Sequence, residues 1–287
     1  MSVPVLRVEE LVKEFTVHHL FRPKEIITAV DHVTFEVQRG SAVGLVGESG
    51  SGKSTTARCV LRLMDPTSGR VFFNGENVTG VSGSALRALR RKMQIVFQDP
   101  YSSLNPRMRV EDIVSEGIRI HKLAPSDEWR RDRVVQLLEM VGLEADHLRR
   151  KPSSFSGGQL QRIGIARALA VGPELLICDE PVSSLDVSIQ AQILNLFRQL
   201  QRDLNLTMLF IAHDLATVRH LCDYIVVMQD GKVVEQGPRE QVYEAPCHPY
   251  TRDLMAAVPI PDPRIERDRR RLRRSLAVAG EHTNPPC

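Results

Sequence analysis

A glycine-rich turn between an apolar run and a helical pattern constrains the fold of this chain more than any other feature. Ala42–Val46 is a short, continuously apolar run, which is typical of a strand buried on both faces of a sheet. Directly after it comes the turn Gly47-Glu-Ser-Gly50-Ser-Gly52-Lys53-Ser54, and a helical pattern begins at Ser54. A strand that passes into a helix in this way is typical of a βαβ unit, so the segment predicts an α/β fold.

Short β-rich runs and helical patterns alternate along most of the chain, which favours an α/β domain with a largely parallel sheet. Most runs are continuously apolar, but Val33–Val37 alternates apolar and polar residues, as a strand exposed on one face does. The expected strands are Leu6–Val8, Val33–Val37, Ala42–Val46, Val71–Phe73, Gln94–Phe97, Leu175–Cys178, Met208–Ile211, Ile225–Met228 and Val233–Glu235. The expected helices are 54–64, 84–91, 127–141, 159–171, 187–203 and 214–221.

Two stretches depart from this alternation. From about Pro100 to Ser156 the chain shows only helical and loop patterns punctuated by prolines, which predicts an inserted helical subdomain. After about Gln236 the strand pattern stops, and a segment rich in proline and arginine runs to Cys287. We interpret this segment as an extension of the core.

The size and the apolar content exclude several classes of protein. With 287 residues, 42% of them apolar, the chain can bury one large core or a core with a smaller appended domain. The longest uncharged apolar runs, Leu206–Ala212 and Tyr224–Met228, are far shorter than the ~18–20 residues that cross a bilayer. Glu9 and Glu10 follow Arg7 closely, without the pattern of a secretory signal, so we expect a cytoplasmic protein.

The positive charge is concentrated near the end of the chain. Residues 264–274 contain seven arginines together with Glu266 and Asp268. The net charge of this segment alone is therefore higher than the +3 of the whole chain, and the rest of the chain is net negative. Nucleic-acid binders usually carry their basic excess on the folded body, so no nucleic-acid partner is expected. The arginine-rich run fits a solvated helix or tail, or a contact with anionic lipid head groups or a partner.

The turn after Ala42–Val46 matches G-x-x-x-x-G-K-[ST], a pattern that binds a nucleoside triphosphate. Its glycines let backbone N–H groups surround phosphate oxygens, Lys53 neutralises the β and γ phosphates, and Ser54 can bind Mg²⁺. A dinucleotide fingerprint is the alternative, but it has no lysine followed by serine. The phosphate-binding residues are expected to be Gly47, Gly50, Ser51, Gly52, Lys53, Ser54 and Thr55.

A pair of carboxylates ends the apolar run Leu175–Cys178. A buried strand would place Asp179 and Glu180 at the carboxyl edge of the sheet, beside the phosphate loop. Asp179 is then suited to hold the metal through water, and Glu180 to orient or deprotonate an attacking water. A polar strand end is the alternative for an isolated Asp-Glu pair.

The segment Ser156-Gly157-Gly158-Gln159 opens a helical pattern with a buried face. A helix start with serine and two glycines is a candidate second anion site. Taken alone, it would be interpreted as an ordinary helix N-cap.

These motifs, in this order, resemble those of the ATP-binding subunit of ABC transporters. The likeness includes Gln98 as the glutamine loop, Ser156–Gln159 as the signature, Ser184-Leu-Asp186 as the D-loop and His213 as the switch histidine. It covers nearly the whole chain. Phe155 departs from the leucine that many members have before the signature, which leaves the signature's polar atoms unchanged.

Finer features resemble the oligopeptide/dipeptide/nickel branch of importers, namely the segment from Gln98 to Arg107 and the run His248-Pro-Tyr-Thr-Arg-Asp-Leu. The resemblance implies a RecA-like core with a mainly parallel sheet, an antiparallel β subdomain, an inserted helical subdomain and a C-terminal extension. The expected divisions are 1–99 for the β subdomain and the first part of the ATP-binding core, 100–158 for the insertion, 159–236 for the rest of the core and 237–287 for the extension.

The resemblance also implies a head-to-tail dimer, in which the signature of one subunit closes over ATP on the phosphate loop of the other. Gln98 would link the metal and the attacking water to the insertion, and His213 would contact the γ phosphate. Phe15 would stack on adenine, although an aromatic residue in an N-terminal strand is usually core and Phe21 is nearby. Taken alone, Gln98 and His213 would each be interpreted as polar strand ends.

The implied function is an MgATP-hydrolysing subunit on the cytoplasmic face of a membrane importer of peptides or similar small solutes. Its partners would be membrane permease subunits, a second ATP-binding subunit that is identical or a paralogue, and indirectly an extracytoplasmic solute-binding protein. The principal alternative is a soluble ABC-type ATPase that acts on DNA or ribosomes. A small-molecule kinase would have no use for the signature, and a regulatory GTPase would need an N-K-x-D motif that the chain lacks.

The cysteines do not suggest a metal cluster. The five cysteines are widely spread without a C-x-x-C pair, so reduced thiols are expected. Some relatives of the importer branch carry a cysteine cluster in this extension that binds iron–sulfur, and Asn284-Pro-Pro-Cys287 resembles the approach to it. Only Cys247 and Cys287 lie beyond the core here, so four thiolate ligands are not available and no cluster is expected.

Overall fold

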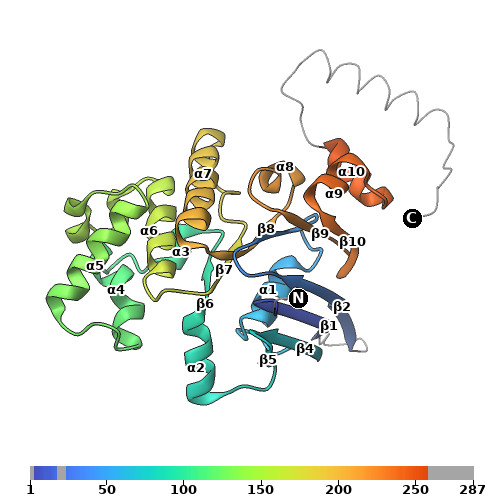
Figure 1. Cartoon of the computed structure of the whole chain (residues 1–287), viewed down its shortest axis with the longest axis horizontal. Helices are drawn as coiled ribbons and strands as arrows, with labels where there is room; N and C mark the ends of the chain where they lie inside the picture. The colour runs from blue at the N-terminus through green and yellow to red at the C-terminus, as the bar shows by residue number, and fades with distance from the viewer. Residues whose placement is uncertain (1–2, 18–23, 258–287) are drawn as a thin grey trace, which may run out of the picture.

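The computed structural model describes residues 3–17 and 24–257, which form two sheets and several groups of helices (Figure 1). The predictions made for Phe21, for the arginine-rich run 264–274 and for Cys287 lie outside the described residues. In the described part of the chain, no helix combines the length and apolar character that a bilayer span requires.

A six-stranded sheet forms the centre of the molecule, with the order β10-β9-β3-β8-β7-β6. The strands from β9 to β6 are parallel to one another, and β10 pairs antiparallel with β9 at one edge. The sheet is therefore mainly parallel, as expected. Its strands are β3 (Ala42–Val46), β6 (Met93–Val96), β7 (Leu175–Asp179), β8 (Thr207–Ala212), β9 (Tyr224–Gln229) and β10 (Lys232–Pro238).

The central strands are continuously apolar because helices or a second sheet cover both of their faces. In β8, Met208 and Phe210 join one buried cluster, whereas Leu209 and Ile211 join the other. The first cluster also contains residues of the insertion and of the helix α7 (Val187–Leu204). The second contains residues of the helix α1 (Lys53–Val60) and of the smaller sheet. The period of two along each strand therefore distributes its side chains between two cores.

A smaller antiparallel sheet has the order β2-β1-β4-β5 and consists of β1 (Leu6–Val17), β2 (Glu25–Val37), β4 (Ser68–Phe73) and β5 (Glu76–Asn77). The helix α1 (Lys53–Val60) contacts β1, β2 and β7 and so lies between the two sheets (Figure 1). Val33, Phe35 and Val37 are buried while Thr34 and Glu36 are exposed, which confirms the strand exposed on one face. The antiparallel β part that the resemblance implied is thus present.

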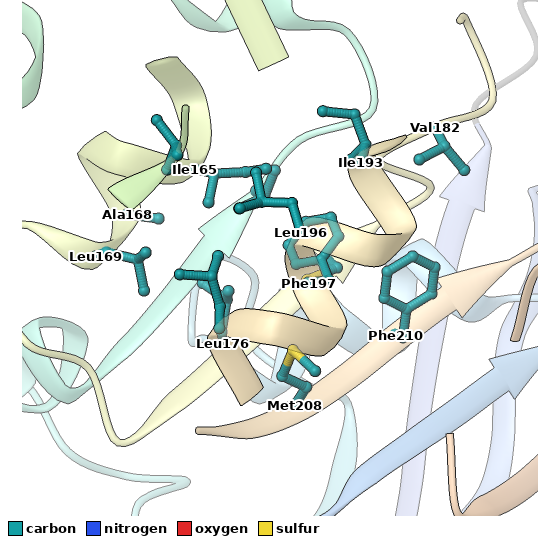
Figure 2. Packing of buried hydrophobic residues seen from close by; sticks show 14 of the residues in the cluster. Ile165, Ala168, Leu169, Leu176, Val182, Ile193, Leu196, Phe197, Met208 and Phe210 are labelled. Atoms are coloured by element: carbon teal, nitrogen blue, oxygen red, sulfur yellow. The ribbon is translucent and has the colours of Figure 1, made fainter. Parts of the chain in front are cut away.

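The insertion is helical, with α3 (Pro100–Ser103), α4 (Val110–Ile120), α5 (Asp127–Met140) and short 3-10 turns at Ala145–Arg149 and Pro152–Ser154. These helices contact α6 (Gly157–Leu169), which leads back to β7. Figure 2 shows Ile165 and Leu169 of α6 facing Leu196 and Phe197 of α7 (Val187–Leu204). The ring of Phe197 meets Phe210 edge-on, with their centroids 5.5 Å apart. Packing against α7 and the sheet thus holds α6 in place.

The chain remains folded for some distance beyond Gln236. The strand β10 continues to Pro238, and the helices α9 (Arg239–Glu244) and α10 (Pro249–Ala257) follow. Val242 and Leu254 are buried in the same cluster as the central sheet. The described part of the extension therefore packs against the core.

The remaining helices of the described residues are α2 (Gly83–Lys92) and α8 (Leu215–Val218).

Candidate active site

The predicted site residues follow neighbouring parallel strands. The phosphate loop follows β3, Asp179 ends β7, His213 follows β8, and Gln98 comes two residues after β6. These strands stand in the order β3-β8-β7-β6, so their carboxyl ends share one edge of the sheet. Residues far apart in the sequence therefore meet at this edge, which is where the ligand sites of open α/β sheets form.

Close backbone approaches explain two glycines of the phosphate loop, Gly47 and Gly52. A Cβ atom on Gly47 would lie 2.1 Å from the carbonyl oxygen of Met228. Gly52 adopts a positive φ of 98°, and a Cβ there would lie 2.2 Å from the carbonyl oxygen of Ala29. Any side chain at either position would displace a neighbouring strand or its own loop, so the conformation of the loop requires glycine.

Lys53 directs its ammonium group into the loop that precedes it. Nζ donates to the carbonyl oxygens of Gly47 at 2.6 Å and Glu48 at 2.7 Å, and it lies 3.3 Å from Ser51 Oγ. Only 3% of the residue is exposed. Burial lowers the pKa of Lys53, and the nearby carboxylates of Glu180 and Asp179 oppose that effect. The ammonium group thus lies in a buried cradle where phosphate oxygens could replace the loop carbonyls.

A short hydrogen bond joins the phosphate loop to the acidic strand end. Ser54 Oγ donates to Asp179 Oδ1 at 2.7 Å, and Asp179 is buried. A hydroxyl and a carboxylate oxygen are hard ligands of the kind that Mg²⁺ takes. Ser54 and Asp179 therefore fit the metal that the sequence predicts.

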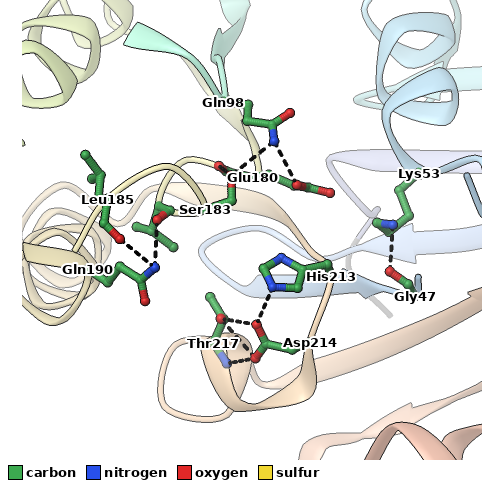
Figure 3. A network of polar contacts seen from close by, with 11 residues as sticks. Gly47, Lys53, Gln98, Glu180, Ser183, Leu185, Gln190, His213, Asp214 and Thr217 are labelled. Atoms are coloured by element: carbon green, nitrogen blue, oxygen red, sulfur yellow. Dashed lines mark hydrogen bonds and ion pairs between the residues drawn. The ribbon is translucent and has the colours of Figure 1, made fainter. Parts of the chain in front are cut away.

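Gln98 makes different contacts from those predicted for a metal ligand. Its Nε2 donates to Glu180 Oε2 at 3.2 Å and to Ser183 Oγ at 3.1 Å (Figure 3). The side chain therefore joins the glutamine loop to Glu180. Its role in metal binding stays a prediction.

Glu180 leaves the strand β7 in a conformation that is uncommon for residues other than glycine. Its φ is 47°, and its N–H donates to the carbonyl oxygen of Ile211 at 3.1 Å. The left-handed conformation costs roughly 1–2 kcal/mol. Backbone strain of this kind clusters at functional sites, where surrounding contacts maintain it.

His213 and Glu180 line the same small cavity. Its volume is about 80 Å³, and Ser183, Gln190 and Thr217 also line it. A polar cavity of this size has room for water. His213 Nε2 lies 3.3 Å from Asp214 Oδ2, while Asp214 Oδ1 accepts a hydrogen bond from the backbone N–H of Thr217 at 2.7 Å (Figure 3). Asp214 thus both caps α8 and contacts the histidine ring.

The signature segment forms a capping box at the start of α6. Ser156 Oγ accepts from the N–H of Gln159 at 3.4 Å, and the Gln159 side chain accepts from the N–H of Ser156 at 3.0 Å. A Cβ on Gly158 would lie 2.5 Å from Ile189 of α7, and one on Gly157 would lie 3.3 Å from Leu185. Within the described residues, no hydrogen bond or ion pair joins this segment to the phosphate loop.

Two predicted residues lie apart from these contacts. Asp186 is exposed at the start of α7 and makes no side-chain capping bond. Phe15 lies on β1 with 37% of it exposed, and the Lys13 ammonium group is 5.3 Å from the centre of its ring. An exposed aromatic face is available for stacking, but the roles of both residues stay predictions.

The site includes contacts that sequence reasoning missed. Ser183 and Asp214 each lie one to three residues from a predicted site residue, and the spacing of Asp214 and Thr217 is that of a helix N-cap. That spacing was the available signal for Asp214. The hydroxyl of Tyr250 accepts a hydrogen bond from the N–H of Glu48, 202 residues away in the sequence, and no local pattern indicates it.

The chain is similar to known transport proteins. The family described as ABC transporter matches residues 30–183, and the family described as oligopeptide/dipeptide transporter, C-terminal region, matches residues 234–285. The oligopeptide transport ATP-binding protein OppF of Bacillus subtilis is 56% identical over 252 residues, covering 88% of this chain and 83% of that protein. The dipeptide transport ATP-binding protein DppF of Lactococcus lactis is 53% identical, covering 84% of this chain and 78% of that protein.

Solved structures with a similar fold are ATP-binding cassettes. A dimeric cassette in a post-hydrolysis state, bound to ADP and phosphate, has a TM-score of 0.73 and 30% identity, covering 82% of this chain and 98% of that one. The cbiO1 structure from Clostridium perfringens has a TM-score of 0.72 and 29% identity, covering 85% and 92% of the two chains. With its two family matches and its phosphate-loop edge, the chain belongs to the ATP-binding subunits of ABC transporters, which are ATPases, and to their oligopeptide/dipeptide branch.

Proposed function

We propose that this chain is the ATP-hydrolysing subunit of an importer, and that it couples MgATP binding and hydrolysis to the uptake of peptides or similar small solutes. The observation that carries the ATPase site is the Ser54–Asp179 hydrogen bond of 2.7 Å. It brings the phosphate loop and the acidic strand end to one place. The names of the similar proteins, which are oligopeptide and dipeptide transport ATP-binding proteins, support peptides as the cargo.

In the proposed site, each polar group has one task. Lys53 exchanges the carbonyl oxygens of its own loop for the β and γ phosphate oxygens of ATP. Ser54 and Asp179 would hold Mg²⁺, which supplies positive charge against the phosphates when it is bound. Glu180 accepts a proton from the attacking water, and His213, which lines the same cavity, contacts the γ phosphate.

The proposed active unit is a head-to-tail dimer. Ser156–Gln159 contacts its own α7 and has no contact with the phosphate loop of its own chain among the described bonds, which leaves it available to a second subunit. In the composite site, Asp186 would contact the nucleotide and Phe15 would stack on its adenine. The dimeric cassette among the similar structures supports this arrangement. The partner would be an identical chain or a paralogue.

The proposed place of work is the cytoplasmic face of the membrane, docked to permease subunits. The C-terminal match to the oligopeptide/dipeptide transporter family favours this setting over a soluble ATPase acting on DNA or ribosomes. An extracytoplasmic solute-binding protein would deliver the cargo to the permease. No nucleic-acid partner is proposed.

The dimer can be tested with the purified chain alone. ATPase activity should rise faster than linearly with protein concentration, because two chains complete each site. Co-expression with permease subunits should then raise the activity per chain in membranes. Strictly linear activity down to high dilution would favour a self-contained monomeric enzyme and contradict the proposal.

A further inference from the structure

A tyrosine of the C-terminal segment contacts the phosphate loop directly. Tyr250 belongs to the run His248-Pro-Tyr at the start of α10, and its hydroxyl accepts a hydrogen bond of 2.9 Å from the N–H of Glu48. Glu48 is the second residue of the phosphate loop. The two residues are 202 positions apart, so only the folding of the extension onto the core brings them together.

Glu48 connects this contact to the functional lysine. While its N–H donates to Tyr250, its carbonyl oxygen accepts from Lys53 Nζ at 2.7 Å and from the N–H of Ser51 at 3.2 Å. One residue of the loop is therefore bonded to Tyr250 through its N–H and to Lys53 through its carbonyl. A shift of the Glu48 backbone would change the position of both neighbouring groups.

Tyr250 is itself fixed in place. The carboxylate of Glu235, on β10, accepts hydrogen bonds from the N–H groups of Cys247 at 2.9 Å and His248 at 3.0 Å. The N–H of Tyr250 donates to His248 Nδ1 at 3.2 Å, and Leu254 anchors α10 in the core. Partial burial raises the pKa of the Tyr250 hydroxyl above its ordinary value.

We propose that Tyr250 is a positioning residue of the ATP site, and that Glu235 holds the Tyr250 segment against the phosphate loop. The hydroxyl of Tyr250 keeps the Glu48 peptide in the geometry from which Lys53 meets the phosphates. The C-terminal segment thereby becomes part of the nucleotide site. This inference rests on the proposed ATP site, but not on the cargo or on docking to a permease.

The first test removes only the hydroxyl. Tyr250→Phe should weaken binding of the ATP analogue MgAMP-PNP about two- to ten-fold in calorimetric titration, as expected for one lost hydrogen bond. The KM for ATP should rise similarly while kcat stays within about two-fold, because the groups that act on water are untouched. Hydrogen exchange should increase in peptides covering residues 47–53. The matched control is Tyr224→Phe, a half-buried tyrosine of β9, which should leave all of these values unchanged.

The second test examines the anchor. Glu235→Ala should weaken MgAMP-PNP binding by a similar factor, and adding Tyr250→Phe to it should cause little further loss, because both changes release one contact. Fully additive losses would contradict the proposed link between Glu235 and Tyr250.

A Lys53→Ala variant separates failure of the inference from failure of the ATP site. If Lys53→Ala binds MgAMP-PNP as the wild type does, the proposed site itself is wrong. If Lys53→Ala loses binding while Tyr250→Phe equals the wild type, only the positioning role is overturned. A Tyr250→Phe variant with a lower melting temperature but unchanged nucleotide binding and exchange would show a purely structural role and would also overturn it.

Discussion

Glu180 is the residue proposed to act on water, and its contacts differ from those of the residues proposed to hold ATP. Its carboxylate accepts from Gln98 and lines the cavity that His213 shares. Lys53, by contrast, lies within the loop that would surround the phosphates. At the scale of single residues, binding and catalysis are therefore assigned to different side chains, and substitutions should separate them.

The first prediction concerns Glu180→Gln. The variant should bind ATP with wild-type affinity but hydrolyse it slower by orders of magnitude, because an amide cannot accept a proton from water. Single-turnover hydrolysis and nucleotide titration measure the two properties, and the ATP-bound dimer should accumulate. Glu128→Gln, on the exposed face of α5, is the control and should be fully active. Undiminished hydrolysis by Glu180→Gln would remove the residue from the mechanism.

Lys53→Ala should behave in the opposite way. It removes the buried positive charge of the phosphate loop, so we expect the Kd for MgATP to rise at least about ten-fold, as loss of a charge-assisted contact of roughly 1.5–3 kcal/mol would give. Arg58→Ala removes an exposed charge from the same helix and should leave the Kd unchanged. Equal ATP affinity in the Lys53 variant and the wild type would count against the assignment.

At the scale of elements, the start of α6 combines a structural and a functional requirement. Ser156 and Gln159 satisfy each other's backbone N–H groups, so the helix needs this serine even without a ligand. Any test of the signature must therefore separate the loss of the cap from the loss of a contact with a second subunit.

A pair of substitutions at Ser156 makes this separation. Ser156→Ala removes the cap and should lower the stability by about 1 kcal/mol, but it leaves space for the partner's nucleotide. Ser156→Arg should bind ATP as the wild type does and yet prevent dimer closure and turnover. Thermal unfolding, ATP titration and ATPase rates distinguish the two. Equal ATPase rates in both variants would mean that only the cap matters.

The central strands were predictable because they are buried on both faces and short. The expected Ala42–Val46 equals β3, and the expected Leu175–Cys178 lies one residue short of β7. By contrast, β1 was expected at Leu6–Val8 only, although it continues to Val17. The part of β1 beyond Val8 contains register shifts and a left-handed Glu10, and most of its residues are exposed or half-buried, so no apolar pattern marks it.

The candidate site was predictable wherever a residue lies at the carboxyl end of a parallel strand or in the loop that follows it. The carboxyl ends of β3, β7 and β8 must meet at one edge, so Lys53, Asp179 and His213 could be grouped from the sequence. Tyr250 could not be assigned to the site from the sequence, because its contact with Glu48 depends on how α9 and α10 fold back onto the core. Those helices are short, and prolines flank them, so periodicity did not reveal them.

At the scale of the whole molecule, hydrogen bonds attach the segment around Gln98 to α6, against which the helices of the insertion pack. Gln161 Nε2 of α6 donates to the carbonyl oxygen of Phe97 at 3.3 Å, and Arg167 Nη1 donates to that of Ser103 at 2.6 Å. Gln98 meanwhile contacts Glu180 at the sheet edge. We therefore expect a change at the γ phosphate to reach α6 and the insertion through this short segment, as a two-state coupling between sites requires.

This arrangement predicts that residues 98–107 and the insertion form the permease contact. The alternative is an ordinary surface turn, which Pro100, Ser102 and Asn105 would also explain. Ser102 and Arg107 are exposed, whereas Ser103 and Met108 are half-buried, so the first two are the better sites for single cysteines. Both should crosslink to permease subunits in membranes, because a docked surface brings the partner within reach of the reagent.

For the crosslinking, Cys247 and Cys287 are replaced by serine so that they do not react with the reagent. Cys59, Cys178 and Cys222 can remain because they are buried, and burial raises the pKa of each thiol. A cysteine at Ser68, exposed on β4 of the antiparallel sheet, is the control and should give no permease adduct. ATP should alter the crosslinking yield of the cysteines placed at Ser102 and Arg107. Adding Lys53→Ala to these variants should abolish the effect of ATP, because only nucleotide bound at the phosphate loop can move the segment through Gln98. Adducts of equal yield at all three positions, or none at the first two, would reject docking through this surface.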